Sequence, residues 1–156
     1  MEAKAKLFGH SIHQMLIVFP LGLLGMGVVF DLVFMNTQDQ IFAAVAYWMM
    51  VAGIVGGLAA APFGLIDWLG IPKGTRAKKV GAVHGLGNVI VLALFALSVW
   101  LRGEENVAPT NAAYVCSFFG VLLALFTGWL GGELVTRFGV GVHDDADVNA
   151  PSLRPH

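Results

Sequence analysis

Charged residues are scarce in this sequence. Of its 156 residues, 12% are Asp, Glu, Lys or Arg and 57% are hydrophobic. A soluble domain carries about 25% charged residues, so the composition excludes an ordinary soluble fold. The formal net charge is −1, so nothing in the composition suggests that the protein binds nucleic acid.

Cysteine is also scarce, since Cys116 is the only one. It has no second cysteine with which to form an internal disulfide, and the sequence has no CxxCH motif for covalent haem attachment. Any haem bound by the chain would therefore be non-covalent, of the b type.

Long apolar segments are abundant by contrast. Four of them lie near residues 14–35, 41–66, 80–101 and 112–135. Each reaches about 20 residues, the length of helix that crosses about 30 Å of hydrocarbon. The first is too long for a signal-peptide core, so we expect it to stay in the mature chain. No internal repeat is apparent beyond the general similarity of these segments.

The connections between the segments are short, which predicts antiparallel neighbours. We therefore expect an all-α integral membrane protein, an up-down four-helix bundle over residues 1–142. Residues 143–156 are polar and contain proline, and we expect a solvated surface tail there.

The basic residues predict the orientation in the membrane, because cytoplasmic ends of membrane helices carry an excess of Lys and Arg. Only Arg102 falls on the side away from the termini. The others fall on the terminal side: Lys4, Lys6, Lys73, Arg76, Lys78, Lys79, Arg137 and Arg154. Both termini should therefore lie in the cytoplasm.

Glycines four residues apart predict where helices approach closely. Gly53 and Gly57 form such a pair in the second segment, and Gly128 and Gly132 form one in the fourth. We expect both pairs to face neighbouring helices.

Polar side chains gather at the terminal end of all four segments. Ionisable residues inside a membrane are costly and usually face the bundle interior or a water-filled cavity. Their convergence therefore predicts a functional site at this end. The residues are His10, His13, Asp67, His84, Asn88, Glu133, Arg137 and, just beyond, His143.

Plainer explanations apply to several of these residues taken alone. His10 and His13, three residues apart, share a helix face and could be interfacial polar groups. Glu133 and Arg137 could do no more than neutralise each other. Asp67 could lie at a helix end among the lipid headgroups.

The histidines suit two kinds of metal chemistry. Haem iron accepts an imidazole on each face, and His13 and His84 lie on diagonally opposite helices of an up-down bundle. Gly81 and Gly85, which flank His84, would either allow close helix packing or leave space for a flat macrocycle. A tetrahedral zinc or iron site could instead use side chains of the same set: His10, His13 and His84 with Asp67 or Glu133.

Four motifs carry a family resemblance: "GHSIHQMLIVFPLGL", "GLID", "HGLGN" and "GGELVTRFGVGV". Together they resemble the DUF2231 family of small bacterial four-helix membrane proteins, from Gly9 to about Val142. The family's entry motif reads G-H-x-x-H-P-x-L-x-x-F-P-x-G-L. Gln14 stands where the family often has proline, and Val18 where some members have histidine or proline, so models with three ligands from the first helix are weakened.

The resemblance implies a multi-pass protein of the bacterial inner membrane. Some members of the family look joined to, or encoded with, Rieske-type iron–sulfur or other redox modules. The resemblance therefore favours electron transfer with such a partner. The positions that match the family motifs are His10, His13, Asp67, His84, Asn88 and Glu133.

These observations combine into one leading prediction, a b-type haem protein that transfers electrons or serves a redox complex in the lipid bilayer. His13 and His84 would be the axial ligands, because His13 lies about one turn deeper than His10. The groups that orient the imidazoles would be Asp67, Asn88 and Glu133. His10 would be an alternate ligand or a propionate contact, and Arg76, Lys79 or Arg137 would balance the charge of the propionates.

Two other functions stay open on the sequence alone. One is a non-catalytic accessory or scaffold subunit, whose polar cluster locks the helices together. The other is a proton-, ion- or metal-handling site built from the histidines and carboxylates, with zinc, iron or no cofactor. Enzymatic activity and assembly into a homo-oligomer are open as well.

Reporter fusions test the predicted orientation. A reporter placed after His156 or between Gly70 and Lys79 should read as cytoplasmic, and one between Arg102 and Asn111 as periplasmic. The opposite set of readings would reverse the orientation and move the histidines to the outer face.

Overall fold

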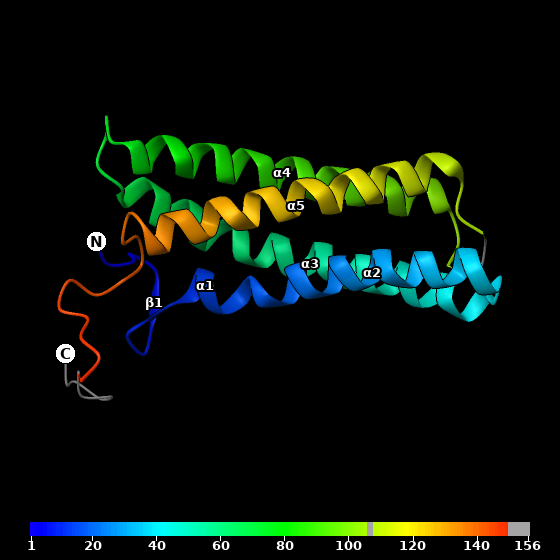
Figure 1. Ribbon diagram of the computed structural model, residues 1–156, viewed down its shortest axis with the longest axis horizontal. Helices are drawn as coiled ribbons and strands as arrows, with labels where there is room; N and C mark the ends of the chain where they lie inside the picture. The colour runs from blue at the N-terminus through cyan, green and yellow to red at the C-terminus, as the bar shows by residue number, and fades with distance from the viewer. Residues whose placement is uncertain (106–107, 150–156) are drawn as a thin grey trace.

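Four long antiparallel helices form a bundle in the computed structural model, which describes residues 1–105 and 108–149 (Figure 1). They are α2 (Val18–Thr37), α3 (Gln40–Gly70), α4 (Arg76–Arg102) and α5 (Asn111–Thr136), and the short α1 (Ile12–Leu16) precedes α2. The N-terminal segment, the α3–α4 connection and the segment after α5 lie at one end, called here the terminal end. The predicted four-helix bundle is confirmed.

The first membrane span is interrupted where α1 gives way to α2. Pro20 has no N–H with which to bond the carbonyl of Leu16, and α1 ends at Leu16. The hydrogen bonds resume at once, since the N–H of Leu21 donates to the Ile17 carbonyl at 3.2 Å. Residues 12–37 therefore still form one apolar span.

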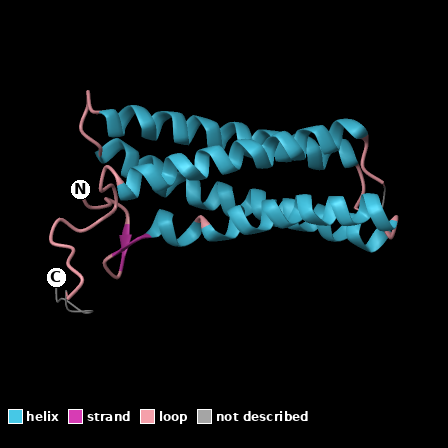
Figure 2. Cartoon of the chain, in the orientation of Figure 1, coloured by secondary structure: helices cyan, strands magenta, loops and turns pink. Residues whose placement is uncertain are grey.

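A small β-hairpin precedes α1 (Figure 2), and the sequence analysis did not predict it. β1 (Lys6–Leu7) pairs antiparallel with β2 (His10–Ser11). Phe8 and Gly9 between them have φ of 49° and 84°, as two-residue hairpin turns require. His10 therefore lies on an exposed strand, and the expectation that it shares a helix face with His13 was wrong.

Side-chain caps fix where three of the long helices begin. Asp39 accepts a hydrogen bond from the N–H of Ile41, Thr75 from that of Lys78, and Thr110 from that of Ala113. Each cap satisfies one backbone donor that the first turn of a helix leaves unpaired. The short polar connections thus set the starts of α3, α4 and α5.

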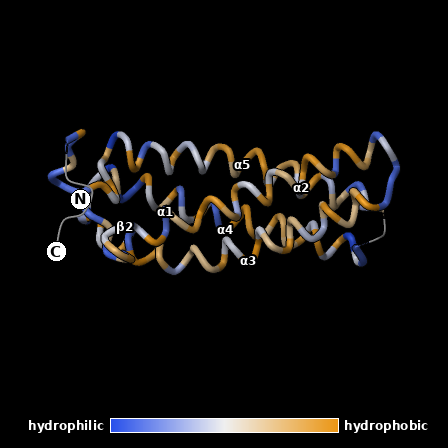
Figure 3. The backbone as a smooth tube through the Cα atoms, turned by 90° about the horizontal axis from the view of Figure 1, so that it is seen from below, coloured by the Kyte–Doolittle hydropathy of each residue, from blue (hydrophilic) through white to orange (hydrophobic). Residues whose placement is uncertain are grey.

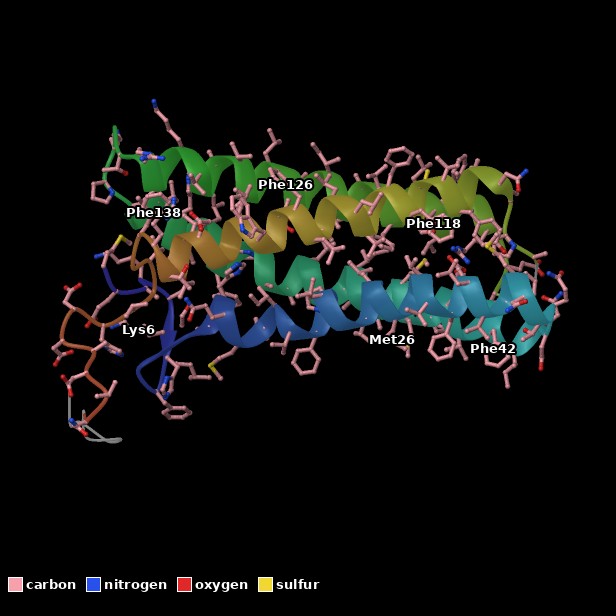
Figure 4. The ribbon with its side chains drawn as sticks, in the orientation of Figure 1. Lys6, Met26, Phe42, Phe118, Phe126 and Phe138 are labelled. Carbon is pink, nitrogen blue, oxygen red and sulfur yellow. The ribbon has the colours of Figure 1, made fainter. Side chains whose placement is uncertain are left out.

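The four spans present apolar side chains outward as well as inward. Met26 and Phe126 are examples of large exposed hydrophobic residues (Figure 4). Figure 3 shows hydrophobic residues along the length of the bundle and hydrophilic ones concentrated toward its two ends. All four spans are long and apolar enough to cross a membrane, so lipid is the environment that suits the outer surface.

The helices pair as two hairpins. α3 packs along α2, and α5 packs along α4, while the two hairpins meet chiefly along α3 and α4. α2 and α4 consequently lie at opposite corners of the bundle. The buried core between the hairpins comprises Leu24, Val28, Met50, Val91, Phe95 and Ala124.

Only one of the two predicted glycine pairs faces a neighbouring helix. A Cβ added at Gly53 would lie 2.6 Å from Leu24, and one added at Gly57 would lie 2.6 Å from Leu92. Gly128 and Gly132 are exposed and have no atom within 4 Å of the Cβ position. The expectation for α5 was therefore wrong, because the rotation of that helix turns both glycines outward.

The two hairpins make the same contacts at equivalent positions, although no repeat is apparent in the sequence. Leu24 fills the space beside Gly53, and Phe95 fills the space beside Gly120. A shift of 71 residues relates Leu24 to Phe95, and a shift of 67 residues relates Gly53 to Gly120.

The same two shifts relate contacts nearer the far end of the bundle. Gly27 lies against the Ala46 carbonyl, which would be 3.4 Å from an added Cβ. Its equivalent, Ser98, donates a hydrogen bond to the Ala113 carbonyl at 2.7 Å. The hairpins are thus two parallel repeats, related by a pseudo-two-fold axis that runs along the bundle.

The glycine contacts predict opposite responses to the same substitution. Gly53→Leu should destabilise the bundle by about 1–3 kcal/mol, because the new side chain would overlap Leu24. Gly132→Leu is the matched control and should leave the melting temperature in detergent within about 2 °C, since its side chain would enter open space. Equal melting temperatures for the two variants would contradict the packing described for α3.

Candidate functional site: a pair of facing histidines

His13 and His84 face each other across the boundary between the hairpins. Their ring centroids are 6.4 Å apart, and the ring planes cross at 86°. His13 lies on α1 and His84 on α4, and both side chains are half-buried. The structure therefore brings together the two histidines that the sequence analysis paired.

Each imidazole is held by a backbone carbonyl of the helix beside it. His13 Nδ1 lies 3.0 Å from the Ala60 oxygen of α3, and His84 Nδ1 lies 2.8 Å from the Thr127 oxygen of α5. A carbonyl oxygen can only accept, so each Nδ1 donates its hydrogen. In a neutral imidazole the lone pair is then on Nε2.

A glycine one turn further along each neighbouring helix makes room for the ring. A Cβ added at Gly64 would lie 2.7 Å from His13 Cε1, and one added at Gly131 would lie 3.1 Å from His84 Cε1. In each half, the glycine follows the residue whose carbonyl holds the histidine by four positions: Gly64 follows Ala60, and Gly131 follows Thr127. The two histidines therefore have equivalent surroundings.

Asn88 completes the surroundings of His84. Its Nδ2 donates to the His84 carbonyl at 2.9 Å and lies 3.2 Å from His84 Nε2. Its Oδ1 accepts a hydrogen bond from Thr127 Oγ1 at 3.0 Å. The hydroxyl therefore orients the amide, which in turn meets the lone-pair side of the imidazole.

Asp67 was expected to orient a histidine, and this expectation was wrong. One of its carboxylate oxygens accepts hydrogen bonds from the N–H groups of Lys4 and Ala5, at 2.6 and 3.0 Å. Its other oxygen accepts from Ser11 Oγ at 3.4 Å. This buried carboxylate ties the N-terminal segment to the end of α3.

Glu133 is also engaged elsewhere, because it forms an ion pair with Arg137 at 3.1 Å. The backbone carbonyls of Ala60 and Thr127 take the role assigned to Asp67 and Glu133. Sequence reasoning could not find them, since every residue has a carbonyl and only the packing of helices shows which one faces a histidine.

The remaining predicted residues lie around the terminal end without contacting the histidine pair. His10 is exposed on β2, Arg76 and Lys79 are exposed in the first turns of α4, and Arg137 is exposed just after α5. They therefore remain candidates for contacts to the propionates of a haem and do not belong to the His13–His84 pair.

His143 was expected to be solvated as part of the tail, and this expectation was wrong. Its Nδ1 lies 2.8 Å from Glu2 Oε1, and its Nε2 lies 3.2 Å from the Gly9 oxygen. Hydrogen bonds from Lys6 and from His143 lower the pKa of Glu2 to about 2. The start of the tail therefore packs against the N-terminal segment.

The alternative tetrahedral metal site is not formed in the part of the chain that the structure describes. No three side chains of His, Cys, Asp or Glu lie close enough there to hold one metal ion. The reason is the separate placement of its predicted ligands, with His10 on β2 and both Asp67 and Glu133 bonded to other groups.

A second polar cluster, which the sequence analysis missed, lies at the far end of the bundle. Asp31 and Arg102 form a buried ion pair, with Ser98 and Ser117 hydrogen-bonded to it. The available signal was a pair of opposite charges at the same depth in the first and third spans. Arg102 had instead been counted only as a residue that marks orientation.

Removal of the Asp67 carboxylate should release the N-terminal segment. In Asp67→Ala the N–H groups of Lys4 and Ala5 lose their acceptor, and hydrogen bonds to charged groups contribute about 1.5–3 kcal/mol each. Hydrogen exchange at these amides should become at least about tenfold faster, measured by mass spectrometry in detergent. Glu133→Ala, at the same end, should leave that exchange unchanged. Wild-type exchange rates in Asp67→Ala would refute the anchoring role.

A family model described as a predicted membrane protein (DUF2231) matches residues 9–144. No curated protein and no solved structure matches the chain. The matched range contains both histidines, their carbonyl partners and all four membrane spans. The chain belongs to the DUF2231 family of predicted membrane proteins.

Proposed function

We propose that this protein binds a b-type haem between its two hairpins, with His13 and His84 as axial ligands, and that it transfers electrons as a redox subunit. The observation that carries the proposal is the 6.4 Å between the two ring centroids. A bond from imidazole nitrogen to metal is about 2 Å, so two rings on opposite sides of one metal have centroids about 6 Å apart. The observed spacing suits one iron between the rings.

The hydrogen bonds of the two rings also suit this role. Histidines that bind a metal through Nε2 commonly donate the Nδ1 hydrogen to a carbonyl or carboxylate, which fixes the ring and makes it a better ligand. Both rings donate in this way, to Ala60 and to Thr127. Asn88 Nδ2 also donates to the His84 carbonyl. If His84 Nε2 bound a metal, the Asn88 amide would therefore keep this second hydrogen-bond acceptor.

The packing of the bundle is compatible with a flat group between the hairpins. Contacts are dense within each hairpin and sparser between the two. Near the histidines, Trp68 of α3 closes this boundary, since a Cβ added at Gly81 of α4 would lie 2.7 Å from it. A bound macrocycle would displace that contact and leave the packing within each hairpin intact. Iron binds imidazole in its neutral form.

Bound haem would supply one-electron redox chemistry. The chain itself orients the two rings and offers basic side chains at the same end, with Arg76 and Lys79 exposed on α4. These, with Arg137, would balance the charge of the haem propionates, and His10 would be an alternate ligand or a propionate contact. Two acidic propionates beside a cationic surface form complementary charges.

The electron partner in this proposal is a Rieske-type or other redox protein that meets the terminal end. Seven of the eight basic residues that the structure describes lie at that end, and Arg154 lies outside the described residues. This distribution supports a cytoplasmic position for both termini in the bacterial inner membrane. The site would then exchange electrons at the cytoplasmic face.

The absorption spectrum of purified protein tests the proposal. Protein expressed with ample haem should be red with a Soret band. His13→Ala and His84→Ala should each lose the low-spin spectrum or the pigment, because no neighbouring apolar residue can replace the missing nitrogen. His143→Ala is the control and should leave the spectrum nearly intact, because His143 bonds Glu2 and Gly9 away from the histidine pair.

Other outcomes would overturn all or part of the proposal. Colourless wild-type protein that contains zinc or iron would favour a metal site, and colourless protein without metal would favour the scaffold function. Loss of pigment in His10→Ala alone would keep haem as the cofactor but refute the pairing of His13 with His84.

A further inference from the structure

The Asp31–Arg102 ion pair joins the two hairpins at the end away from the histidines. The guanidinium of Arg102 donates to both carboxylate oxygens of Asp31, at 2.7 and 2.6 Å. The two side chains are 0% and 1% exposed. Asp31 lies on α2 and Arg102 on α4, so the pair crosses the boundary between the halves.

Asp31 and Arg102 occupy equivalent positions in the two halves. They are 71 residues apart, which is the shift that relates His13 to His84. In both pairs a residue contacts its own equivalent, so both pairs lie on the pseudo-two-fold axis. The axis thus has a like pair at one end and a pair of opposite charges at the other.

A residue on the axis would meet its own copy if two identical hairpins paired. Pairing of two first hairpins from different molecules would bring Asp31 against Asp31, and pairing of two second hairpins would bring Arg102 against Arg102. Each combination buries two like charges without a partner, which strongly disfavours the complex. Only the pairing of a first with a second hairpin satisfies both charges.

The same two residues also define how the hairpins align along the axis. Asp31 follows His13 by 18 residues, and Arg102 follows His84 by 18 residues. This is five helical turns, or about 27 Å of rise. When the ion pair forms, the two histidines are therefore level, whereas a slip of one turn would leave both buried charges unpaired.

We infer that Asp31 and Arg102 select the type of partner and the register of the hairpins, so that a first hairpin pairs with a second hairpin and the histidines meet. The short connection between α3 and α4, residues 71–75, makes that second hairpin the one of the same chain. A contribution to strength alone is a poorer explanation, because apolar residues of similar volume commonly replace a buried ion pair without loss of stability. This inference does not depend on the identity of any group bound by the histidines.

A disulfide across the hairpin boundary reports the native pairing. A Cβ at Gly57 of α3 would lie 3.4 Å from Leu92 Cγ of α4, the atom whose place a cysteine sulfur would take. Gly57→Cys with Leu92→Cys, in a Cys116→Ser background, should therefore cross-link within one chain. Asp31→Arg and Arg102→Asp should each reduce the yield of this intramolecular cross-link at least tenfold. The double variant, Asp31→Arg with Arg102→Asp, should restore the yield to within twofold of the parent.

An apolar pair separates selection from strength. Asp31→Leu with Arg102→Leu removes the like-charge penalty against wrong partners, so the dimer fraction in detergent should rise at least tenfold by light scattering while helical content is kept. Failure of the charge-swapped double variant to restore the cross-link would overturn the inference. A Leu–Leu variant that stays monomeric with the parent's cross-link yield would overturn it as well.

Discussion

A polar group buried in a membrane-spanning bundle must find its partner within the protein, because lipid offers no hydrogen bonds. Here the partners lie on other helices. His13 and His84 each bond a carbonyl of the neighbouring helix, and Asp31 bonds Arg102 across the hairpin boundary. Each of these bonds forms only when the helices are correctly rotated and aligned, so the polar groups specify an arrangement that apolar packing alone would leave loosely defined.

The two polar pairs on the pseudo-two-fold axis differ in their roles. A metal that accepts the same ligand on both faces suits identical residues on the axis, and His13 and His84 are identical. Correct pairing of two similar halves suits different residues on the axis, and Asp31 and Arg102 carry opposite charge. The apolar core between them, around Phe95, separates a site that could bind a redox group from a site that directs assembly.

The sequence predicted the polar end of the bundle because depth in the membrane follows from position along an apolar segment. His13, His84 and Asn88 met as a group there. Asp67 was placed at the correct end and given the wrong partner, since its partners are the backbone N–H groups of Lys4 and Ala5. A contact to backbone depends on the path of a loop, and nothing in the side-chain pattern records that path.

The sequence by itself determined the membrane class, the four spans, their up-down order and the end at which polar residues gather. Those properties follow from segment length and loop length, which act locally. Only the tertiary structure decided which face of each helix turns inward, why Gly53 is packed while Gly132 is exposed, and that the two hairpins repeat each other. A helix that is apolar on all sides has no polar stripe to mark its outer face, so its rotation is settled by the shapes and polar groups of the helices it meets.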